Sequence, residues 1–355
     1  MSGSPLGSGA LPSTLGIVNS LDWTHRPTDL EFGPAAWQSR LLGGLTAVFV
    51  RPVIALLTLI GMVVNRFHPE LVQRGRYDII DGPFRAFRAL PGTTVTPIKL
   101  DDCDAEWIIA PRAQGSDRVI IYFHGSALIT LGLNSHRRWA SKLSAATGAR
   151  VLNVGYRLAP QALIEDAIAD GVCAYRMVLT AGVDAEKIVF AGDSAGGLIA
   201  TGTALAARDA GLQVPAGQIL LSPLTSSDMN LKYNAMLEHR DVLFPFMAVK
   251  YLYDVFATKN GTHPVPEMPT EADLHGLGPT LLQVGNNEML RNDSFALADA
   301  LRAAGALAWV QVWDKAMHMF QLSFDVNPDA RKAVDEIVDF FEYATTQHQP
   351  GEVAS

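Results

Sequence analysis

From about residue 94 to the C-terminus, continuous apolar runs alternate with amphipathic helical patterns. Runs such as VIIYF, KIVFA and TLLQV have no polar face, which is typical of strands covered on both sides in a parallel sheet. They predict eight strands, at residues 94–100, 106–110, 118–123, 150–156, 187–191, 218–221, 280–284 and 309–313. Helical patterns lie between them at residues 137–147, 163–181, 195–210 and 294–304, and a last helix runs to about residue 346. This alternation predicts an α/β fold with a doubly wound, mostly parallel sheet.

Two segments interrupt the alternation. Residues 20–90 are apolar and helical in pattern, with Pro and Gly breaks, and residues 225–277 combine aromatic residues with a Pro-rich run. We interpret both as parts of a cap that covers the sheet. The predicted organisation is a disordered tail at residues 1–19, an N-terminal helical cap segment at 20–90, an α/β core at 91–224 and 278–348, and a cap insertion at 225–277.

Residues 41–64 are apolar over about the length that crosses a lipid bilayer. Arg51 and Pro52, however, lie in the middle of this stretch. An arginine at the membrane centre costs about 2.5–3.5 kcal/mol on insertion scales, and proline kinks or breaks a helix. We therefore expect two short helices that pack on the core or lie at a surface. Peripheral membrane contact through residues 41–64 is one consequence, and a membrane span is the alternative.

Composition narrows the function classes. The 355 residues carry a formal net charge of −8 and form no basic stripe for nucleic acid. Cys103 and Cys173 belong to no CxxC pair or Cys/His cluster, which argues against a metal site through sulfur and suits a reducing compartment, with one disulfide as the alternative. Residues 1–16 lack the basic start and apolar run of a secretory signal. We expect a cytoplasmic protein, or one that is membrane-associated through residues 41–64.

The stretch KIVFAGDSAGGLIATGTALAA carries the clearest chemistry. An apolar strand runs into Gly192-Asp193-Ser194-Ala195-Gly196, and an Ala/Leu-rich helix follows. This is the Gly-x-Ser-x-Gly nucleophile elbow in its strand–turn–helix setting, where small neighbours permit a sharp, strained turn. Ser194 would project over the edge of the sheet at a helix N-terminus, whose dipole favours developing negative charge. The pattern predicts that Ser194 is a catalytic nucleophile.

A serine nucleophile needs a base, and the base needs an acid that orients it. In this kind of fold the acid and then the histidine follow the serine along the chain. His318 lies just after the last predicted strand and fits this order. The acid should follow the strand at residues 280–284, where we predict Glu288. Asp293 is the alternative, but it lies where a helix N-cap is expected, and capping alone explains an Asp there.

Five motifs occur in order and at suitable spacing: HGSA, VGYRLAPQ, GDSAGG, VGNNEMLRNDS and MHMF. Together they resemble the hormone-sensitive-lipase-like group of α/β-hydrolases, also called bacterial esterase family IV, from about residue 94 to the C-terminus. The resemblance implies an α/β-hydrolase fold, with helices on both faces of the sheet and a helical cap built from an N-terminal segment and an insertion. It also implies hydrolysis of small-molecule carboxylic esters without metal or organic cofactor, and family members often form homodimers.

By position, the resemblance assigns a catalytic triad to Ser194, Glu288 and His318, and an oxyanion hole to Gly125, Ser126, Ala127 and Ala195. The usual acid of the family is Asp, so Glu288 is one carbon longer. The usual oxyanion loop of the family is His-Gly-Gly-Gly, and here Ser126 and Ala127 take the places of the last two glycines. Their side chains restrict the backbone conformations that glycine would allow. Gly155 in place of Asp and Gln161 in place of Glu are further departures, at positions that support the site.

We predict a serine carboxylic-ester hydrolase that works through an acyl-enzyme on hydrophobic short- to medium-chain acyl esters. An apolar cap favours hydrophobic substrates without naming one, so a lactone or lipid hydrolase of the same fold is an alternative. A small-molecule-binding descendant without catalysis is another alternative. The altered oxyanion loop supports that reading, and the presence of His318 argues against it.

Overall fold

The computed structural model describes residues 23–125, 127–257 and 267–346. A nine-stranded sheet forms its centre, in the spatial order β1-β9-β8-β7-β6-β4-β5-β3-β2. The strands are β1 (Asp29–Phe32), β2 (Thr94–Lys99), β3 (Asp104–Ile109), β4 (Val119–Phe123), β5 (Arg150–Gly155), β6 (Ile188–Asp193), β7 (Gly217–Leu221), β8 (Thr280–Gly285) and β9 (Ala308–Trp313). Neighbouring strands pair in parallel, except that β3 is antiparallel to both β2 and β5. The predicted mostly parallel α/β sheet is therefore confirmed.

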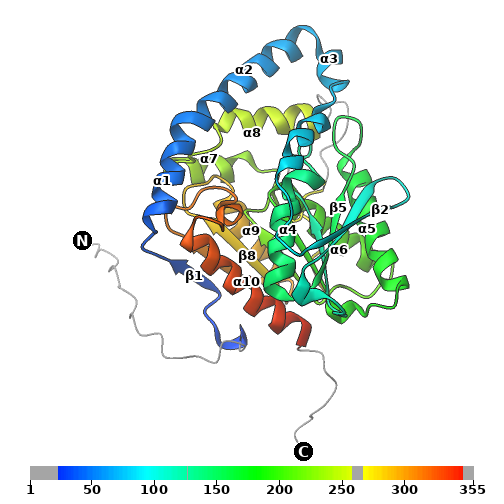
Figure 1. Ribbon diagram of the computed structural model, residues 1–355. Coiled ribbons are helices and arrows are strands. Elements are labelled where there is room, and N and C mark those ends of the chain that lie inside the picture. Colours follow the sequence, from blue (N-terminus) through cyan, green and yellow to red (C-terminus); the bar gives the residue numbers. More distant parts are fainter. Residues whose placement is uncertain (1–22, 126, 258–266, 347–355) are drawn as a thin grey trace, which may run out of the picture.

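Helices cover both faces of this sheet and extend beyond one of its edges (Figure 1). The α-helices are α1 (Trp37–Leu45), α2 (Arg51–Phe67), α3 (Pro69–Gln73), α4 (Leu133–Thr147), α5 (Ile164–Thr180), α6 (Ala195–Asp209), α7 (Met229–Glu238), α8 (Phe246–Leu252), α9 (Arg291–Ala303) and α10 (Pro328–Thr346). Shorter 3₁₀ or π segments lie at Trp23–His25, Thr46–Val50, Tyr77–Ala86, Pro111–Ala113, Ala185–Lys187, Tyr253–Ala257 and Phe320–Ser323.

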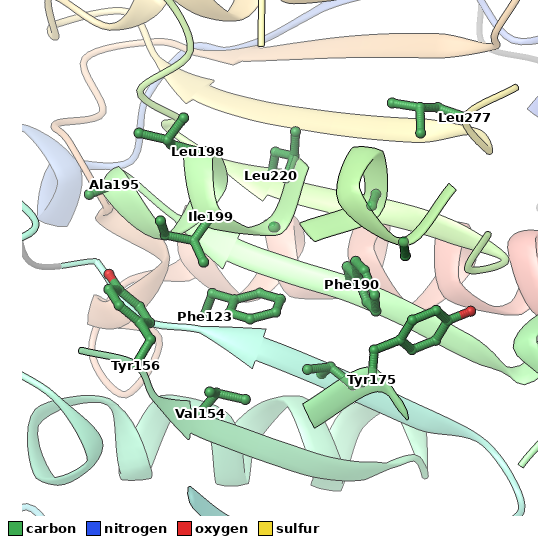
Figure 2. Packing of buried hydrophobic residues seen from close by; sticks show 14 of the residues in the cluster. Phe123, Val154, Tyr156, Tyr175, Phe190, Ala195, Leu198, Ile199, Leu220 and Leu277 are labelled. Atoms are coloured by element: carbon green, nitrogen blue, oxygen red, sulfur yellow. The ribbon is translucent and has the colours of Figure 1, made fainter. Parts of the chain in front are cut away.

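Alternation along the central strands builds two hydrophobic cores, one on each face of the sheet. In β4, Val119, Ile121 and Phe123 pack on one face, and Ile120 and Tyr122 pack on the other. Helices α5, α6 and α9 cover the first face, and α4 and α10 cover the second. Figure 2 shows the first core, where side chains of the strands and of the covering helices interlock. A strand buried on both faces needs apolar residues at every position, which explains the continuous apolar runs.

The prediction of eight strands is wrong by one. The ninth strand, β1, lies within residues 20–90, which were interpreted as helical. It pairs in parallel with β9 at the edge of the sheet, so that Asp29 lies opposite Val310 and Phe32 opposite Trp313. Its four residues are exposed or half-buried in alternation. An edge strand this short has no apolar run that would mark it in the sequence.

The prediction of two short helices around Arg51 and Pro52 is also wrong. α1, the π-helical turn Thr46–Val50 and α2 form one continuous helix of 31 residues, Trp37–Phe67. Proline lacks an N–H donor, and its ring clashes with the carbonyl of the residue four positions earlier. The N–H of Arg51 bonds to the carbonyl of Thr46, and this wider turn shifts the hydrogen-bond register so that the ring is accommodated. Among the described residues, this is the one helix long and apolar enough to cross a membrane by length and composition.

The cap elements lie at one end of the molecule. Figure 1 shows α2 as the outermost helix, with α8 beside it and α7 nearer the sheet. Helices α7 and α8 come from the segment 225–277, so two parts of the chain that are far apart in sequence lie against each other above the sheet.

Candidate active site

The candidate residues lie in loops that follow the carboxyl ends of five neighbouring strands. β4, β6, β7, β8 and β9 run in parallel, so the loops that follow them all leave from their carboxyl ends. These loops carry Gly125, Ser194, Ser222, Glu288 and His318. Ligand sites of open α/β sheets lie at this edge, outside the carboxyl ends of the strands.

Ser194 lies in a strained turn between β6 and α6. Its φ of 52° and ψ of −122° lie in a region that residues with a side chain rarely adopt. Its N–H donates to the carbonyl of Leu221 at 2.8 Å, which ties the turn to β7. A Cβ atom on Gly192 would lie 2.2 Å from the carbonyl oxygen of Gly196, and one on Gly196 would lie 2.0 Å from that of Phe123. Both positions therefore require glycine, as expected for a nucleophile elbow.

His318 and Glu288 form a buried pair. Nδ1 of His318 lies 2.6 Å from Oε2 of Glu288. The other carboxylate oxygen, Oε1, accepts the hydroxyl of Ser222 at 2.7 Å and the N–H of Gly285 at 2.6 Å. Burial disfavours the charged imidazolium, but nearby carboxylates, Glu288 foremost and then Asp241 and Asp193, together outweigh burial and raise the pKa of His318 above its usual value. Because a carboxylate only accepts hydrogen bonds, this contact favours the neutral tautomer of His318 with its proton on Nδ1 and a lone pair on Nε2.

Asp293, the alternative acid, has different partners. Both of its oxygens accept from Nζ of Lys232 at 2.9 Å, and Oδ2 also accepts the N–H groups of Thr225 and Ser226. Helix α9 begins at Arg291, so the expected role of Asp293 as its N-cap is wrong. Burial raises the pKa of Asp293 by more than Lys232 lowers it. The structure thus places Glu288 against the histidine and Asp293 against a lysine of α7.

The carboxylate of Asp193 holds the loop after β4 in place. Its Oδ1 accepts the hydroxyl of Tyr122 and, at 2.7 Å, the N–H of Gly125, and its Oδ2 lies 3.5 Å from Nε2 of His136. Burial alone would raise the pKa of Asp193, but His136 and these hydrogen bonds outweigh burial and lower it. The Gly125 N–H is committed to this carboxylate. Gly125, which we predicted as part of the oxyanion hole, therefore anchors the loop and does not offer its N–H as an oxyanion donor.

Comparison with known proteins identifies the family of this site. Residues 120–322, more than half of the chain, match the family described as the α/β hydrolase fold. The chain belongs to the α/β-hydrolase family. It is 33% identical over 334 residues to the carboxylesterase/phospholipase LipF of Mycobacterium tuberculosis, covering 91% of this chain and 86% of LipF. It is also 33% identical over 278 residues to an acetyl-hydrolase of Streptomyces hygroscopicus, covering 77% of this chain and 90% of that protein.

The structural comparison agrees with the sequence comparison. A crystal structure of an esterase from the bacterial hormone-sensitive lipase family superimposes with a TM-score of 0.72 and 25% identity, covering 88% of this chain and all of that one. The hormone-sensitive-lipase-like resemblance predicted from the motifs is confirmed, and the protein is an esterase-type hydrolase.

Two described residues of the loop after β4 adopt a backbone conformation that favours glycine. Ser126 lies outside the described residues. Ala127 has a φ of 50° and Leu128 a φ of 65°, both in the left-handed region that favours glycine. Ala195 opens the 15-residue helix α6, whose first N–H groups have no partner within the helix. Ala127 and Ala195, two of the residues that we predicted for the oxyanion hole, line the same cavity as Ser194.

The cavity over Ser194 is apolar and has a volume of about 70 Å³. It lies between the elbow and the cap, and His318 forms part of its wall. Its apolar lining comes from core and cap together: Ala127, Leu128, Ile164, Ala195, Leu198, Leu224, Met229, Phe244, Val249, Leu252, Phe256, Met268, Met289 and Leu290. Its polar lining residues are Ser194, Asp241, Tyr253 and His318. A ligand in this space meets hydrocarbon on most sides.

Asp241 is a lining residue that the sequence analysis missed. It is buried; its Oδ1 accepts the N–H groups of Leu243 and Phe244, and its Oδ2 accepts the N–H of Met289. It therefore ties the cap segment to the loop that carries the acid. Burial raises the pKa of Asp241 despite these hydrogen bonds. The bond to the N–H two residues later is an Asx-turn, which could have been inferred from the sequence, whereas the bond to Met289 could not.

Other candidate chemistry is limited in the described part of the chain. Cys103 and Cys173 are both free thiols. Across residues 23–125, 127–257 and 267–346, no group of three or more His, Cys, Asp or Glu side chains is arranged to hold a metal ion. The candidate reacting groups are therefore those around the cavity.

Proposed function

We propose that this esterase cleaves small hydrophobic carboxylic esters with Ser194 as nucleophile, His318 as base and Glu288 as the acid that orients the base. The observation that carries the proposal is the 2.6 Å contact between Nδ1 of His318 and Oε2 of Glu288, beside a cavity lined by both His318 and Ser194. This contact favours the tautomer in which Nε2 can accept a proton. The Ser222 and Gly285 hydrogen bonds keep the carboxylate in place.

The reaction then proceeds in two acyl transfers. Oγ of Ser194 bonds to the ester carbonyl carbon while its proton passes to Nε2 of His318. The tetrahedral intermediate breaks its bond to the alcohol oxygen, which leaves with that proton, and the acyl-enzyme remains. Water attacks the acyl carbon in the same way, its proton passing through His318 back to Ser194, and the carboxylic acid leaves. The N–H of Ala195 and the loop through Ala127 supply donors for the oxyanion.

The cavity supports an uncharged substrate with a short acyl group. Its small volume and apolar wall favour a few methylene groups and disfavour charge next to the carbonyl. The name of the Streptomyces relative, an acetyl-hydrolase, agrees with a short acyl group. The name of LipF includes phospholipase, which keeps a lipid ester as the second candidate.

Labelling with a fluorophosphonate, followed by peptide mapping, tests the nucleophile directly. We expect one labelled peptide that contains Ser194, and we expect Ser194→Ala to remove the label and to lower kcat on p-nitrophenyl butyrate by on the order of 10⁶-fold. Ser116→Ala is a matched control, because Ser116 precedes β4 at the opposite edge of the sheet. Retained activity in Ser194→Ala would overturn the assignment.

A substrate series separates the candidates that share this site. Activity should be highest on short p-nitrophenyl esters and fall as the acyl chain lengthens. Higher activity on a lactone panel or on phospholipid would instead favour those substrates. A folded protein that binds esters without turnover and takes no label would favour the non-catalytic descendant.

A further inference from the structure

The long helix Trp37–Phe67 has its apolar side on the outside of the molecule. We use the name outer face for thirteen of its residues, which are each 44–71% exposed: Trp37, Leu41, Leu45, Val48, Phe49, Val50, Val53, Leu56, Leu57, Leu59, Ile60, Val63 and Phe67. Helices on water-soluble surfaces show the reverse arrangement, with the apolar stripe toward the core. An apolar surface of this extent on a folded chain marks a binding surface for an apolar partner.

The buried residues of the same helix, Ser39, Gly43 and Thr46, are small, and its inner side is held by the rest of the protein. Ser39 donates to Asn327 at 3.1 Å and to Asp329 at 2.7 Å, and both of these residues lie at the start of α10. Further along, Gly61 lies so close to Tyr251 of α8 that a Cβ atom would be 2.9 Å from the phenol oxygen. The orientation of the helix is therefore fixed by contacts along its length, and the outer face is kept outward.

Charge around the outer face indicates the chemistry of its partner. Residues 37–90 contain seven arginines, no lysine and three acidic residues, a net charge of +4 in a chain whose total is −8. Three exposed arginines lie at the two ends of the outer face, Arg40 near its start and Arg66 and Arg74 near its end. The segment with Arg85 and Arg88 instead packs beside α4. Apolar residues bordered by arginine match the acyl region and the anionic headgroups of a lipid surface.

We propose that the outer face docks on an anionic lipid surface, with the helix lying in the plane of that surface. The attachment of its inner side to α8 and α10 favours a helix that lies on the membrane over one that crosses it, as do Arg51 and Pro52 near its middle. A second copy of the chain is a poorer partner, because a twofold contact through this face would bring the arginines of the two copies together.

Docking would also bring the cavity close to lipid. Val249 and Leu252 of α8, with Phe256 just beyond it, line the cavity over Ser194, and α2 packs on the outer side of α8. The two helices α2 and α8 thus lie between the proposed lipid surface and the cavity (Figure 1). A hydrophobic substrate dissolved in the bilayer would reach the cap without crossing bulk water.

Vesicle flotation of the full chain tests the proposal without any substrate, so its outcome is independent of the proposed ester hydrolysis. We expect binding to vesicles of phosphatidylcholine with about 30% phosphatidylglycerol, at least tenfold weaker binding to phosphatidylcholine alone, and release when salt is raised from about 0.1 M to about 0.5 M. Release by salt distinguishes docking from a membrane span, which salt does not extract.

Two pairs of variants separate the apolar and the charged contributions. Leu56→Gln/Ile60→Gln on the outer face should weaken binding about tenfold or more, whereas Leu307→Gln/Val326→Gln, with similar exposure elsewhere, should not. Arg66→Gln/Arg74→Gln should weaken binding to anionic vesicles about tenfold or more, whereas Arg176→Gln/Lys332→Gln, with the same change of charge, should leave it within about twofold.

Each contrary result overturns the proposal. No binding to anionic vesicles, equal losses in the outer-face and control variants, or protein that stays in the membrane at high salt would each do so. So would a dimer in sedimentation velocity without lipid that the Leu56→Gln/Ile60→Gln variant abolishes, because the outer face would then be a contact between copies of the chain.

Discussion

At the scale of single residues, the charge of Glu288 can be removed by a substitution that keeps the shape of its side chain. Glu288→Gln keeps the side-chain length and removes the charge that contributes most to raising the pKa of His318, so that pKa falls relative to the wild-type protein. The amide also ceases to select the tautomer with its proton on Nδ1. We expect kcat/KM to fall by about 10³–10⁴-fold. Activity is lost as pH falls through the pKa of His318, because the protonated base accepts no proton. The acidic limb of the pH profile should therefore move to lower pH.

The carboxylate of Glu271 provides the control for this substitution. Glu271 lies on the cap and hydrogen-bonds to Ser227, away from the cavity lining. Glu271→Gln should leave both kcat/KM and the acidic limb near their wild-type values. If Glu288→Gln kept more than about a tenth of the activity and an unshifted limb, the role of Glu288 as the orienting acid would be refuted.

The sequence could place Ser194, Glu288 and His318 at the same end of the sheet because each follows a predicted strand and parallel strands end side by side. The partners of these residues were not predictable in the same way. Ser222 supports Glu288 from the end of β7, and Asp241 reaches Met289 from the cap. Such bonds join segments that are distant in sequence and leave no local pattern.

At the scale of elements, a buried ion pair joins the cap helix α7 to the core helix α9. Lys232 and Asp293 are both fully buried, and Nζ of Lys232 also donates to the carbonyl of Ser226. Lys232→Met leaves Asp293 without its cation in a site that water does not reach. We expect the free energy of unfolding to fall by about 3–5 kcal/mol, as measured by urea denaturation.

Two control variants distinguish the cost of leaving a buried charge without a partner from the loss of an ion pair as such. Lys232→Met/Asp293→Leu removes both charges and should recover most of the loss. Lys250→Met breaks an exposed pair between Lys250 of α8 and Asp254 just beyond it, and should cost less than about 1 kcal/mol. If Lys232→Met cost no more than Lys250→Met, the pair would not hold the cap to the core.

Elements with a strong periodic signal were predictable, and those determined by tertiary contacts were not. The eight predicted strands and the helices between them lie within a few residues of their predicted positions. β1 depends on pairing with β9, and the continuity of Trp37–Phe67 depends on a π turn that forms just before Pro52. Neither feature is encoded by local periodicity.

At the scale of the whole molecule, the residues that precede the long helix Trp37–Phe67 pack on the core. Trp23 is fully buried, with its ring edge-on to Trp309 and Phe340 at centroid distances of 5.3 Å. Arg26 stacks over the Trp23 ring at 4.4 Å and pairs with Glu336 of α10 at 2.7 Å. β1 then adds to the sheet, and the long helix follows. Cap and core are therefore linked at the base of the helix as well as through α7 and α8.

This linkage predicts that Trp23 contributes to the stability of the core and Trp37 does not. Trp23→Ala removes a fully buried ring, so we expect the free energy of unfolding to fall by about 3–5 kcal/mol in one cooperative transition. Trp37, on the same segment, is 68% exposed, so Trp37→Ala should change stability by less than about 0.5 kcal/mol while weakening vesicle binding. Urea denaturation monitored by far-UV circular dichroism, combined with vesicle flotation, measures both effects. Equal stabilities of the two variants would mean that Trp23 does not contribute to the stability of the core. A loss of stability in Trp23→Ala and a loss of vesicle binding in Trp37→Ala would assign Trp23 to the fold and Trp37 to the surface that meets lipid.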